Sequence, residues 1–374
     1  GFLFKRKGEG LFLLLIILGN LFYILFLNTV SLKLTAFGIP SYLVIALGIG
    51  YGMGYLLEKG RGINERYNRI RLGSKSLYEY VAPLLILVLP LLPLSKNYCE
   101  NDRSRYYLAY DYGLNILKTL EKNAIFFSSG DIATFAIAYL NIVETKRPDV
   151  TIYHRSGNLY QDIYSFYTGR RLSGEEREKQ RNRIEREMVS TTSRPVYYIR
   201  DVSEELPGYF LEPQGLVYRV RREGVKIRKG RNYWKDYRMR GMEDERVFKD
   251  YLTRRMVAEY YYRLGNYYFQ RGDRKKAVEQ YSKASRIGWE VKGRHYSLGQ
   301  AYQRVGMIDM AILEYEKAIE FRPHFTSAYN NLGVCYAQKE QYQEAKREWE
   351  KALSINPGHE EAGKNLERLK NREQ

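Results

Sequence analysis

The sequence predicts a multidomain membrane protein with three transmembrane helices, a small α/β domain and an α-helical solenoid, in that order. Three observations lead to this fold class. Long uncharged runs fill the first part of the chain, strand-like and helix-like segments alternate in the middle, and a 34-residue period marks the end. The expected regions are therefore residues 1–95, 96–250 and 251–374, and a length of 374 residues also favours several domains.

The charge and the cysteines exclude two classes of function. Lys and Arg outnumber Asp and Glu by 61 to 43, which gives a net charge of +18. The excess is spread over loops and helical surfaces and forms no recognisable nucleic-acid module, so no nucleic-acid partner is expected. The two cysteines, Cys99 and Cys335, have no metal-ligand spacing. The sequence therefore predicts neither a metal site nor a disulfide framework.

Three apolar runs predict the transmembrane helices, at about 11–28, 34–57 and 77–95. The first run has an uncharged core from 11 to 27, about 26 Å long as a helix, which with its neighbours can cross a bilayer. A cleaved signal peptide is the alternative, but this core is longer than usual and two further runs follow it. The glycines at 48, 50, 52 and 54 have the spacing of helix packing in membranes rather than of a phosphate loop.

The basic clusters predict the orientation of these helices. They lie at 5–7 and 59–71, before the first run and between the second and third. By the positive-inside rule these segments are cytoplasmic, so the residues after about 95 are exoplasmic, in a periplasm or a lumen. We therefore expect an integral membrane protein with the lipid bilayer as one partner.

The middle of the chain predicts a small α/β domain. A strand at 124–128, a helix at 132–145 and a strand at 150–153 form a βαβ unit, whose two strands should be parallel. A charged helix at 174–189 and a strand at 195–200 continue the alternation, and 216–221 is expected to add an antiparallel edge.

The carboxyl ends of these strands predict a ligand crevice, because ligands of such sheets bind there. Polar loops occur in any protein, however, so the inference needs support from the fold. For Asp131 two roles remain open: a catalytic carboxylate, or a cap that accepts hydrogen bonds from the first amides of the next helix, which we favour. The candidate crevice residues are Ser128, Ser129, Asp131, His154, Arg155, Arg200 and Asp201.

The 34-residue period is the pattern of tetratricopeptide repeats, with Leu-Gly, Tyr and Ala at fixed positions. We expect repeats at 258–291, 292–325 and 326–359 and a cap helix at 360–374. Their concave face is expected to bind a protein, an acceptor or a scaffolded partner. The candidate groove residues are Tyr261, Asn266, His295, Asn330, Asn331 and Gln338.

Two stretches, NDRSRYYLAYDYGLNIL and NAIFFSSGDIATFAIAYLNIVETKRPDVTIYHR, resemble a known family. Similar segments follow the last membrane span in polytopic glycosyltransferase-like proteins related to protein O-mannosyltransferases, of the GT-C class. The resemblance is carried by Gly130-Asp131 and by Arg147-Pro148-Asp149-Val150 and concerns the C-terminal part of that family.

The resemblance implies transfer of a sugar from a polyprenyl-phosphate donor and no cofactor in this chain. It also implies an acidic catalytic residue in the first exoplasmic loop, but the loop TVSLKLTAFGIP has no carboxylate, so no catalytic residue is assigned. We therefore expect the chain to be the acceptor-recruiting, C-terminal portion of a longer enzyme. The alternative is a non-enzymatic, membrane-anchored scaffold or assembly protein of the cell envelope.

Overall fold

The computed structural model describes residues 71–72, 75–76 and 106–373, apart from 158, 166–171, 226–230 and 248. The chain divides into two compact units, Gly1–Asn101 and Asp102–Gln374. In the first unit the described residues form one short antiparallel pair, β1 (Arg71–Leu72) and β2 (Lys75–Ser76). All remaining elements belong to the second unit.

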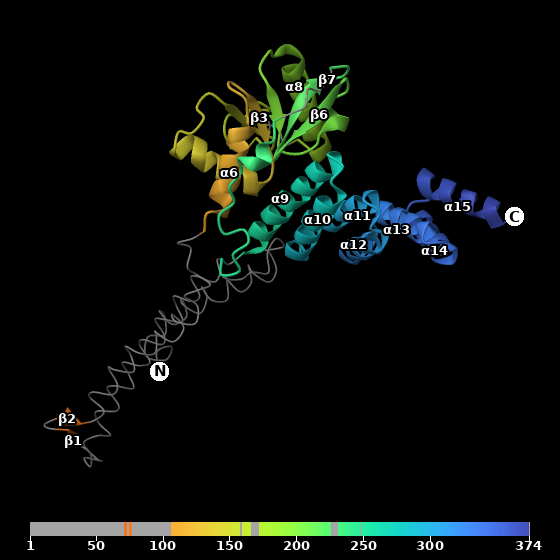
Figure 1. Ribbon diagram of the computed structural model, residues 1–374. Helices are drawn as coiled ribbons and strands as arrows, with labels where there is room; N and C mark the ends of the chain where they lie inside the picture. Colours follow the sequence, from red (N-terminus) through yellow and green to blue (C-terminus); the bar gives the residue numbers. More distant parts are fainter. Residues whose placement is uncertain are drawn as a thin grey trace, which may run out of the picture. The chain divides into compact units, whose positions relative to one another are not determined.

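The second unit contains a five-stranded sheet in the order β4-β3-β5-β7-β6. Of these strands, β3, β6 and β7 are labelled in Figure 1. β3 lies between β4 and β5 and is parallel to both, which confirms the predicted βαβ unit. β7 pairs antiparallel with β5 and with β6. The strands are β3 (Ile125–Ser128), β4 (Thr151–His154), β5 (Val196–Tyr198), β6 (Tyr209–Gln214) and β7 (Val217–Arg222).

Helices cover both faces of this sheet, because the central strand is apolar on both sides. Phe126 belongs to the core shared with α6 (Leu108–Thr119) and α7 (Asp131–Ala138). Phe127 points to the opposite core, which includes Val189 of α8 (Gly174–Thr191). The domain therefore has three layers, with β3 buried at its centre.

Two elements differ from the predicted ones. The helix after β3 ends as an α-helix at Ala138 and continues as a π-helical turn, η2 (Tyr139–Val143). β7 is antiparallel as predicted, but it is not the edge, because β6 pairs with its outer side. Pro213 of β6 has no amide hydrogen to donate, and an edge strand tolerates that loss. Short 3-10 turns lie at η3 (Ser203–Glu205) and η4 (Tyr233–Lys235).

Paired helices follow the sheet and form the repeats. Each pair is held by a close approach at the glycine of its first helix: an added Cβ at Gly265 would lie 2.4 Å from Cε1 of Tyr281. At Gly299 it would lie 2.6 Å from Cε1 of Tyr315, one repeat later. The helices are α9 (Tyr251–Gln270), α10 (Arg274–Ile287), α11 (Arg294–Arg304), α12 (Ile308–Phe321), α13 (Thr326–Gln338), α14 (Tyr342–Ile355) and α15 (Glu360–Glu373).

One hydrophobic core joins the sheet to the repeats. It runs from Leu108 in α6 through Met256 in α9 to Cys335 in α13. The side-chain amide of Asn115 adds a hydrogen bond of 2.9 Å to the carbonyl of Arg238, in the segment between the sheet and α9. The sheet and the first repeat therefore form one packed body, so side chains from both can line a common site.

The membrane part of the predicted fold class is corrected by the structure. Within the described ranges, no helix combines the length and the apolar character that a bilayer span requires. The α/β domain and the repeat solenoid are present, whereas the three predicted transmembrane helices are not found there. The runs that suggested them, at about 11–28, 34–57 and 77–95, lie outside the described residues.

Candidate functional site

The strand order of the sheet switches direction between the parallel neighbours β3 and β5. The chain leaves β3 through α7 toward β4 on one side, and it leaves β5 toward β6 and β7 on the other. Crevices at such switch points are where open α/β sheets bind ligands. Residues 129–133 after β3 and 199–200 after β5 face each other at this point and line a cavity of ≈ 330 Å³.

This cavity, which we call the switch-point cavity, is completed by the first helices of two repeats. Arg255, Glu259 and Arg263 reach it from α9, and Arg294 reaches it from α11. The sheet alone therefore does not form the site. Its full lining is Tyr112, Ser129, Gly130, Asp131, Ile132, Ala133, Ile199, Arg200, Arg255, Met256, Glu259, Arg263 and Arg294.

The favoured role of Asp131 as a helix cap is wrong. The N-cap of α7 is Gly130, with φ 75 and ψ 147, and no side chain makes a cap hydrogen bond. Asp131 is the first helical residue, and its exposed carboxylate lines the switch-point cavity. A glycine at the cap tolerates this positive φ without strain, and it leaves the first amides of the helix without a side-chain acceptor.

The seven predicted crevice residues separate into three groups. Ser129, Asp131 and Arg200 line the switch-point cavity, and Asp201 lines a second cavity beside it. Ser128 is buried below and donates a hydrogen bond of 3.3 Å to the carbonyl of Tyr153. His154 and Arg155 are also buried, so neither is open to a ligand.

Arg155 belongs to a cluster under the opposite face of the sheet. Its Nε donates to Glu185 of α8 at 2.8 Å, and it also pairs with Glu205. The hydroxyl of Tyr164 donates to the same Glu185 at 2.8 Å. Burial acts to raise the pKa of Glu205, but Arg155, together with the charge of Arg200, lowers it below its usual value. We call Arg155, Tyr164, Glu185 and Glu205 the buried cluster.

A second charged cluster lines the switch-point cavity and was not predicted from the sequence. Glu259 pairs with Arg263 and with Arg294. Burial acts to raise the pKa of Glu259, but the two guanidiniums lower it to about 2. Glu259 and Arg294 are one repeat and one residue apart, so the 34-residue period is the signal that could have placed them on neighbouring helices. We call Glu259, Arg263 and Arg294 the cavity cluster.

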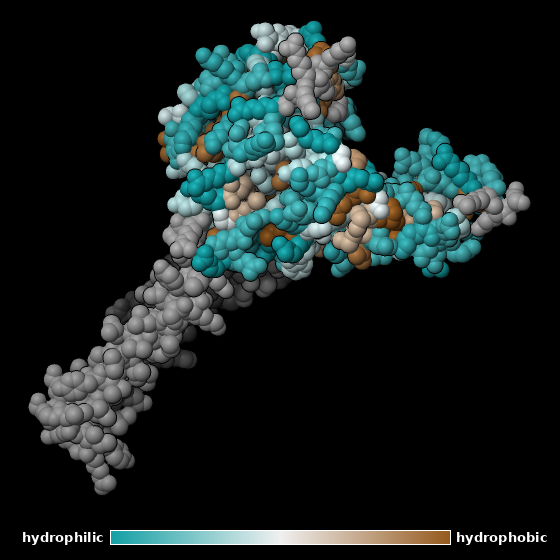
Figure 2. All heavy atoms as spheres, viewed as in Figure 1, coloured by the Kyte–Doolittle hydropathy of each residue, from teal (hydrophilic) through white to brown (hydrophobic). Residues whose placement is uncertain are grey.

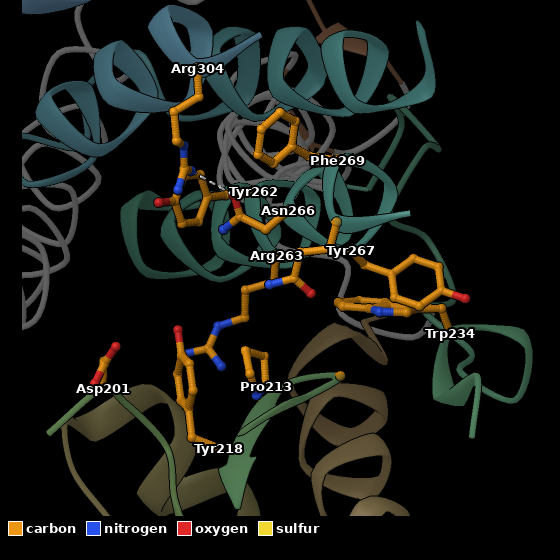
Figure 3. A pocket seen from close by; sticks show the side chains of 12 residues that line it. Asp201, Pro213, Tyr218, Trp234, Tyr262, Arg263, Asn266, Tyr267, Phe269 and Arg304 are labelled. Atoms are coloured by element: carbon orange, nitrogen blue, oxygen red, sulfur yellow. Dashed lines mark hydrogen bonds between the residues drawn. The ribbon is translucent and has the colours of Figure 1, made fainter. Parts of the chain in front are cut away.

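A second cavity, of ≈ 370 Å³, lies between the β6–β7 hairpin and α9, and we call it the hairpin–repeat groove (Figure 3). Arg263 extends from α9 between the two cavities, with its guanidinium 4.8 Å from the ring centre of Tyr218 and 2.6 Å from the carbonyl oxygen of Ile199. The groove lining is Asp201, Pro213, Gly215, Tyr218, Trp234, Tyr262, Arg263, Asn266, Tyr267, Phe269, Gln270 and Arg304.

The hairpin–repeat groove continues onto the concave face of the repeats. Tyr262 and Arg304 also line an adjoining cavity of ≈ 310 Å³, together with Gln300, Gln303 and Asn331. The exposed Arg304 lies over the ring of Phe269 and donates a hydrogen bond of 3.0 Å to Asn266 (Figure 3). Aromatic rings, side-chain amides and a cation therefore follow one another along this surface.

The six predicted groove residues are divided by the structure. Asn266 and Asn331 line the concave surface. Gln338 is exposed but lines a different cavity, beside α14 and α15. The other three, Tyr261, His295 and Asn330, are buried, so placing them in an open groove was wrong.

The buried groove candidates have internal partners. His295 bonds to Glu314 at 2.7 Å and to the carbonyl of Trp289 at 3.0 Å. The hydroxyl of Tyr261 donates to Glu243 at 3.1 Å. Asn330 bonds to its neighbour Asn331 and to residues of α15. These side chains are therefore held by internal hydrogen bonds and are not open to a ligand.

Among the described residues, no three His, Cys, Asp or Glu side chains lie close enough together to bind a metal ion.

On the visible face of the described part, hydrophilic residues cover most of the surface and hydrophobic ones form smaller patches (Figure 2). Recognition at this face would therefore use polar, charged and aromatic groups.

Family models match the chain in two places. The tetratricopeptide repeat matches residues 258–287, 294–325 and 326–359, so the chain contains these repeats, as predicted. The model described as TMEM260-associated domain 2 matches residues 109–164. That match contains β3, the Ser-Ser-Gly-Asp turn and β4.

Among curated proteins, the chain is similar to Protein O-mannosyl-transferase tmem260 of Dictyostelium discoideum, with 29% identity over 163 residues. The match covers 40% of this chain and 19% of that protein, so it spans about a fifth of the relative's length. With the domain match, it confirms the predicted resemblance to proteins related to O-mannosyltransferases.

Solved structures with similar repeats include the first TPR of Spaghetti (RPAP3) bound to the HSP90 peptide SRMEEVD. It is 22% identical, with a TM-score of 0.29, and the match covers 34% of this chain and 97% of that one. YrrB is 22% identical, with a TM-score of 0.28 and coverage of 31% and 64%. MamA is 29% identical, with a TM-score of 0.25 and coverage of 29% and 62%. At TM-scores this low, the likenesses support no argument about binding by the present chain.

Proposed function

We propose that this chain is the acceptor-recruiting part of a protein O-mannosyltransferase-like enzyme and that the hairpin–repeat groove holds an extended segment of the acceptor polypeptide. The sugar donor in this proposal is a polyprenyl phosphate-linked sugar, and transfer takes place on the exoplasmic side. Similarity to an O-mannosyltransferase and the presence of tetratricopeptide repeats support it.

The continuity of the groove is the observation that carries the proposal. Because the two adjoining cavities share Tyr262 and Arg304, an extended chain can lie along both without a break. Side-chain amides, such as those of Asn266 and Asn331, can bond to peptide groups, which recur at regular spacing in any extended segment. Aromatic side chains supply contact area for the side chains of the bound segment.

The charges of the groove favour an acidic segment. Arg304 and Arg271 are exposed beside the groove, and within the described ranges neither forms an ion pair with a carboxylate. A carboxylate of the acceptor can therefore pair with them without displacing an internal carboxylate. Glycosyl transfer also needs a base that deprotonates the acceptor hydroxyl. The groove is given a positioning role only, so a catalytic residue remains unassigned.

The test is acceptor kinetics with the intact enzyme carrying Tyr262→Ala or Arg304→Ala. Loss of one groove contact should raise the KM for the acceptor about tenfold, because contacts of this kind contribute about 1–2 kcal/mol, while kcat stays near the wild-type value. Arg286→Ala, an exposed arginine of α10, is the matched control and should change neither constant. Unchanged KM in both groove variants contradicts the proposal.

The non-enzymatic scaffold gives a different result in the same series. If the groove variants lose a bound partner protein but the intact protein transfers no sugar, the repeats serve assembly and the enzymatic half of the proposal is wrong.

Protease protection of residues 96–374 in sealed vesicles tests the exoplasmic location. Digestion from the cytoplasmic side contradicts it.

A further inference from the structure

The hairpin–repeat groove continues into a further cavity of ≈ 570 Å³, which we call the hairpin-edge cavity. The two cavities share side chains from the β6–β7 hairpin, from η4 and from α9. The shared lining residues are Pro213, Gly215, Trp234, Tyr267 and Gln270. Figure 3 shows Trp234 and Tyr267 at this end of the groove, away from Tyr262 and Arg304. An extended ligand in the groove can therefore continue past Trp234 into the hairpin-edge cavity.

Trp234 and Tyr267 form an aromatic wall where the two cavities meet. Their ring centres lie 6.2 Å apart. The indole also packs edge-on against Tyr237 and Tyr260, with 5.2 Å between ring centres in each pair. Tyr260 belongs to the main hydrophobic core, and Tyr237 packs against it. This packing holds the indole in place before a ligand arrives, which lowers the entropic cost of binding.

The polar groups at this wall that remain unpaired are donors. Among the described residues, the indole N–H of Trp234 and the hydroxyl of Tyr267 form no hydrogen bond. The guanidinium of Arg271 lies 4.7 Å from the ring centre of Tyr267. An indole N–H and a guanidinium can only donate hydrogen bonds. The wall therefore offers donors beside a flat apolar surface.

The acceptors beside the wall are already occupied. Glu212 accepts from Arg221 at 2.9 Å and from the side-chain amide of Gln214 at 3.0 Å. The side-chain oxygen of Gln214 accepts in turn from the hydroxyl of Tyr233 at 3.4 Å. Glu212 and Gln214 are each only 8% exposed. A ligand N–H at this wall would therefore lose water and find few acceptors, whereas a ligand carbonyl would find several donors.

Proline is the residue that meets both conditions. It has no N–H to leave unpaired, and its carbonyl oxygen remains free to accept hydrogen bonds. A run of prolines already forms a polyproline II helix in water, so it loses little conformational freedom on binding. Grooves lined by aromatic side chains recognise such segments in other proteins.

We propose that the Trp234–Tyr267 wall and the hairpin-edge cavity bind a proline-rich segment in the polyproline II conformation. The indole N–H of Trp234 donates to a proline carbonyl, and a carboxylate beside the prolines pairs with the exposed Arg271. This inference rests on the proposed function, because it specifies the class of acceptor segment that the groove takes.

The experiment measures binding of two peptides to the full chain by titration calorimetry. One is an oligoproline with a glutamate at each end. The other has the same length and the same glutamates, with alternating alanine and serine in place of the prolines. The oligoproline should bind at least about tenfold more tightly, because its helix is preformed and it brings no unpaired N–H.

The outcomes separate this inference from the proposed function. Equal affinities, or tighter binding of the alanine–serine peptide, overturn the preference for proline but leave the groove as a site for extended segments. Absence of binding by both peptides also overturns the inference. The proposed function is then decided by the acceptor kinetics of Tyr262→Ala and Arg304→Ala, which change the other end of the groove.

Two substitutions locate the prolines on the wall. Trp234→Phe keeps an aromatic ring and removes the indole N–H, so the affinity for oligoproline should fall about fivefold. Tyr267→Ala removes the other ring from the surface of α9 and should weaken binding about tenfold. Trp289→Phe changes an exposed tryptophan that lines neither cavity and is the matched control. Affinities of both wall variants equal to that of Trp289→Phe overturn the assignment.

Tryptophan fluorescence gives an independent readout of the same contact. The chain has three tryptophans, and the third, Trp349, is buried in the repeats. Saturating oligoproline should change the emission of the wild type and of Trp289→Phe, but not that of Trp234→Phe. An emission change of unaltered size in Trp234→Phe would place the peptide away from the wall and overturn the inference.

Discussion

The buried cluster and the cavity cluster use the same residue types on opposite sides of one sheet. In the buried cluster, Arg155 is 3% exposed and is held by two carboxylates, Glu185 and Glu205. In the cavity cluster the ratio is reversed, since one carboxylate, Glu259, holds two arginines beside an open cavity. The number of arginines alone therefore does not identify a binding site. The number of internal carboxylates decides whether a guanidinium is available to bind a ligand.

The largest effect is expected from Arg155→Met. The change leaves Glu185 buried without its cation, which costs about 3–5 kcal/mol in the free energy of unfolding. Urea unfolding of the variant measures this cost. The double variant Arg155→Met, Glu185→Leu should recover part of the loss, because it removes the uncompensated charge. A loss below about 1 kcal/mol in the single variant would show that the buried cluster is not structural.

Glu259→Gln should have the next largest effect, and it should depend on pH. The folded-state pKa of Glu259 is about 2, against an ordinary value of 4.5. Because the folded pKa is depressed, the carboxylate stabilises the fold above pH 4.5 and loses this contribution as the pH falls toward 2. The free energy of unfolding of the wild type should exceed that of the variant by about 3 kcal/mol at pH 6. This difference should shrink as the pH falls. A difference that is constant between pH 6 and pH 3 contradicts the ion pairs.

Arg200→Gln tests the residue that contacts both regions. Arg200 lines the switch-point cavity and also bonds to Glu205, and its side chain is 48% exposed. Solvent screens such a pair, so we expect a loss of at most about 1 kcal/mol by urea unfolding. A loss as large as that of Arg155→Met would place Arg200 in the buried cluster and weaken its assignment to the cavity.

The smallest effect on stability is expected from Arg255→Gln. Since Arg255 is exposed and holds no side-chain partner within the described ranges, unfolding should change by less than about 0.5 kcal/mol. Thermal unfolding of the variant beside the wild type measures this change. A loss as large as that of Arg200→Gln would show that Arg255 has an internal partner.

The repeats were the most predictable part of the fold because their period repeats the same contacts. Gly265 and Gly299 recur where the tyrosine of the second helix packs against the first. The sheet was predictable where apolar strands alternate with a helix, as in β3 and β4. β6 was missed, because an edge strand tolerates Glu212 and Pro213 and therefore lacks the apolar pattern of a central strand.

Part of the site could be predicted from strand ends. Ser129, Asp131 and Arg200 follow strands and do meet in one cavity. Arg155 also follows a strand, but a side chain one position along can turn to the other face of the sheet, and here Glu185 holds it there. The contribution of α9 was not predictable from local patterns, because it depends on how the first repeat packs against the sheet.

The groove residues also show that a sequence pattern does not by itself tell which side of a helix a residue occupies. Tyr261 and His295 occupy equivalent positions in successive repeats, and both face inward to acidic partners. Tyr262, the next residue along α9, lies in the groove instead. A turn of about 100° per residue separates buried from exposed positions, so an error of one position exchanges core for groove.

Arg263 forms part of the wall of both cavities, and this position has a thermodynamic consequence. Suppose that a ligand in the switch-point cavity binds better to one placement of the Arg263 guanidinium. That ligand then changes the free energy of peptide binding in the hairpin–repeat groove. By linkage, the peptide must then change the affinity for that ligand by the same factor. The two sites would therefore behave as a heterotropic pair, and the sign of their cooperativity would be set by which placement of a single side chain each occupant prefers.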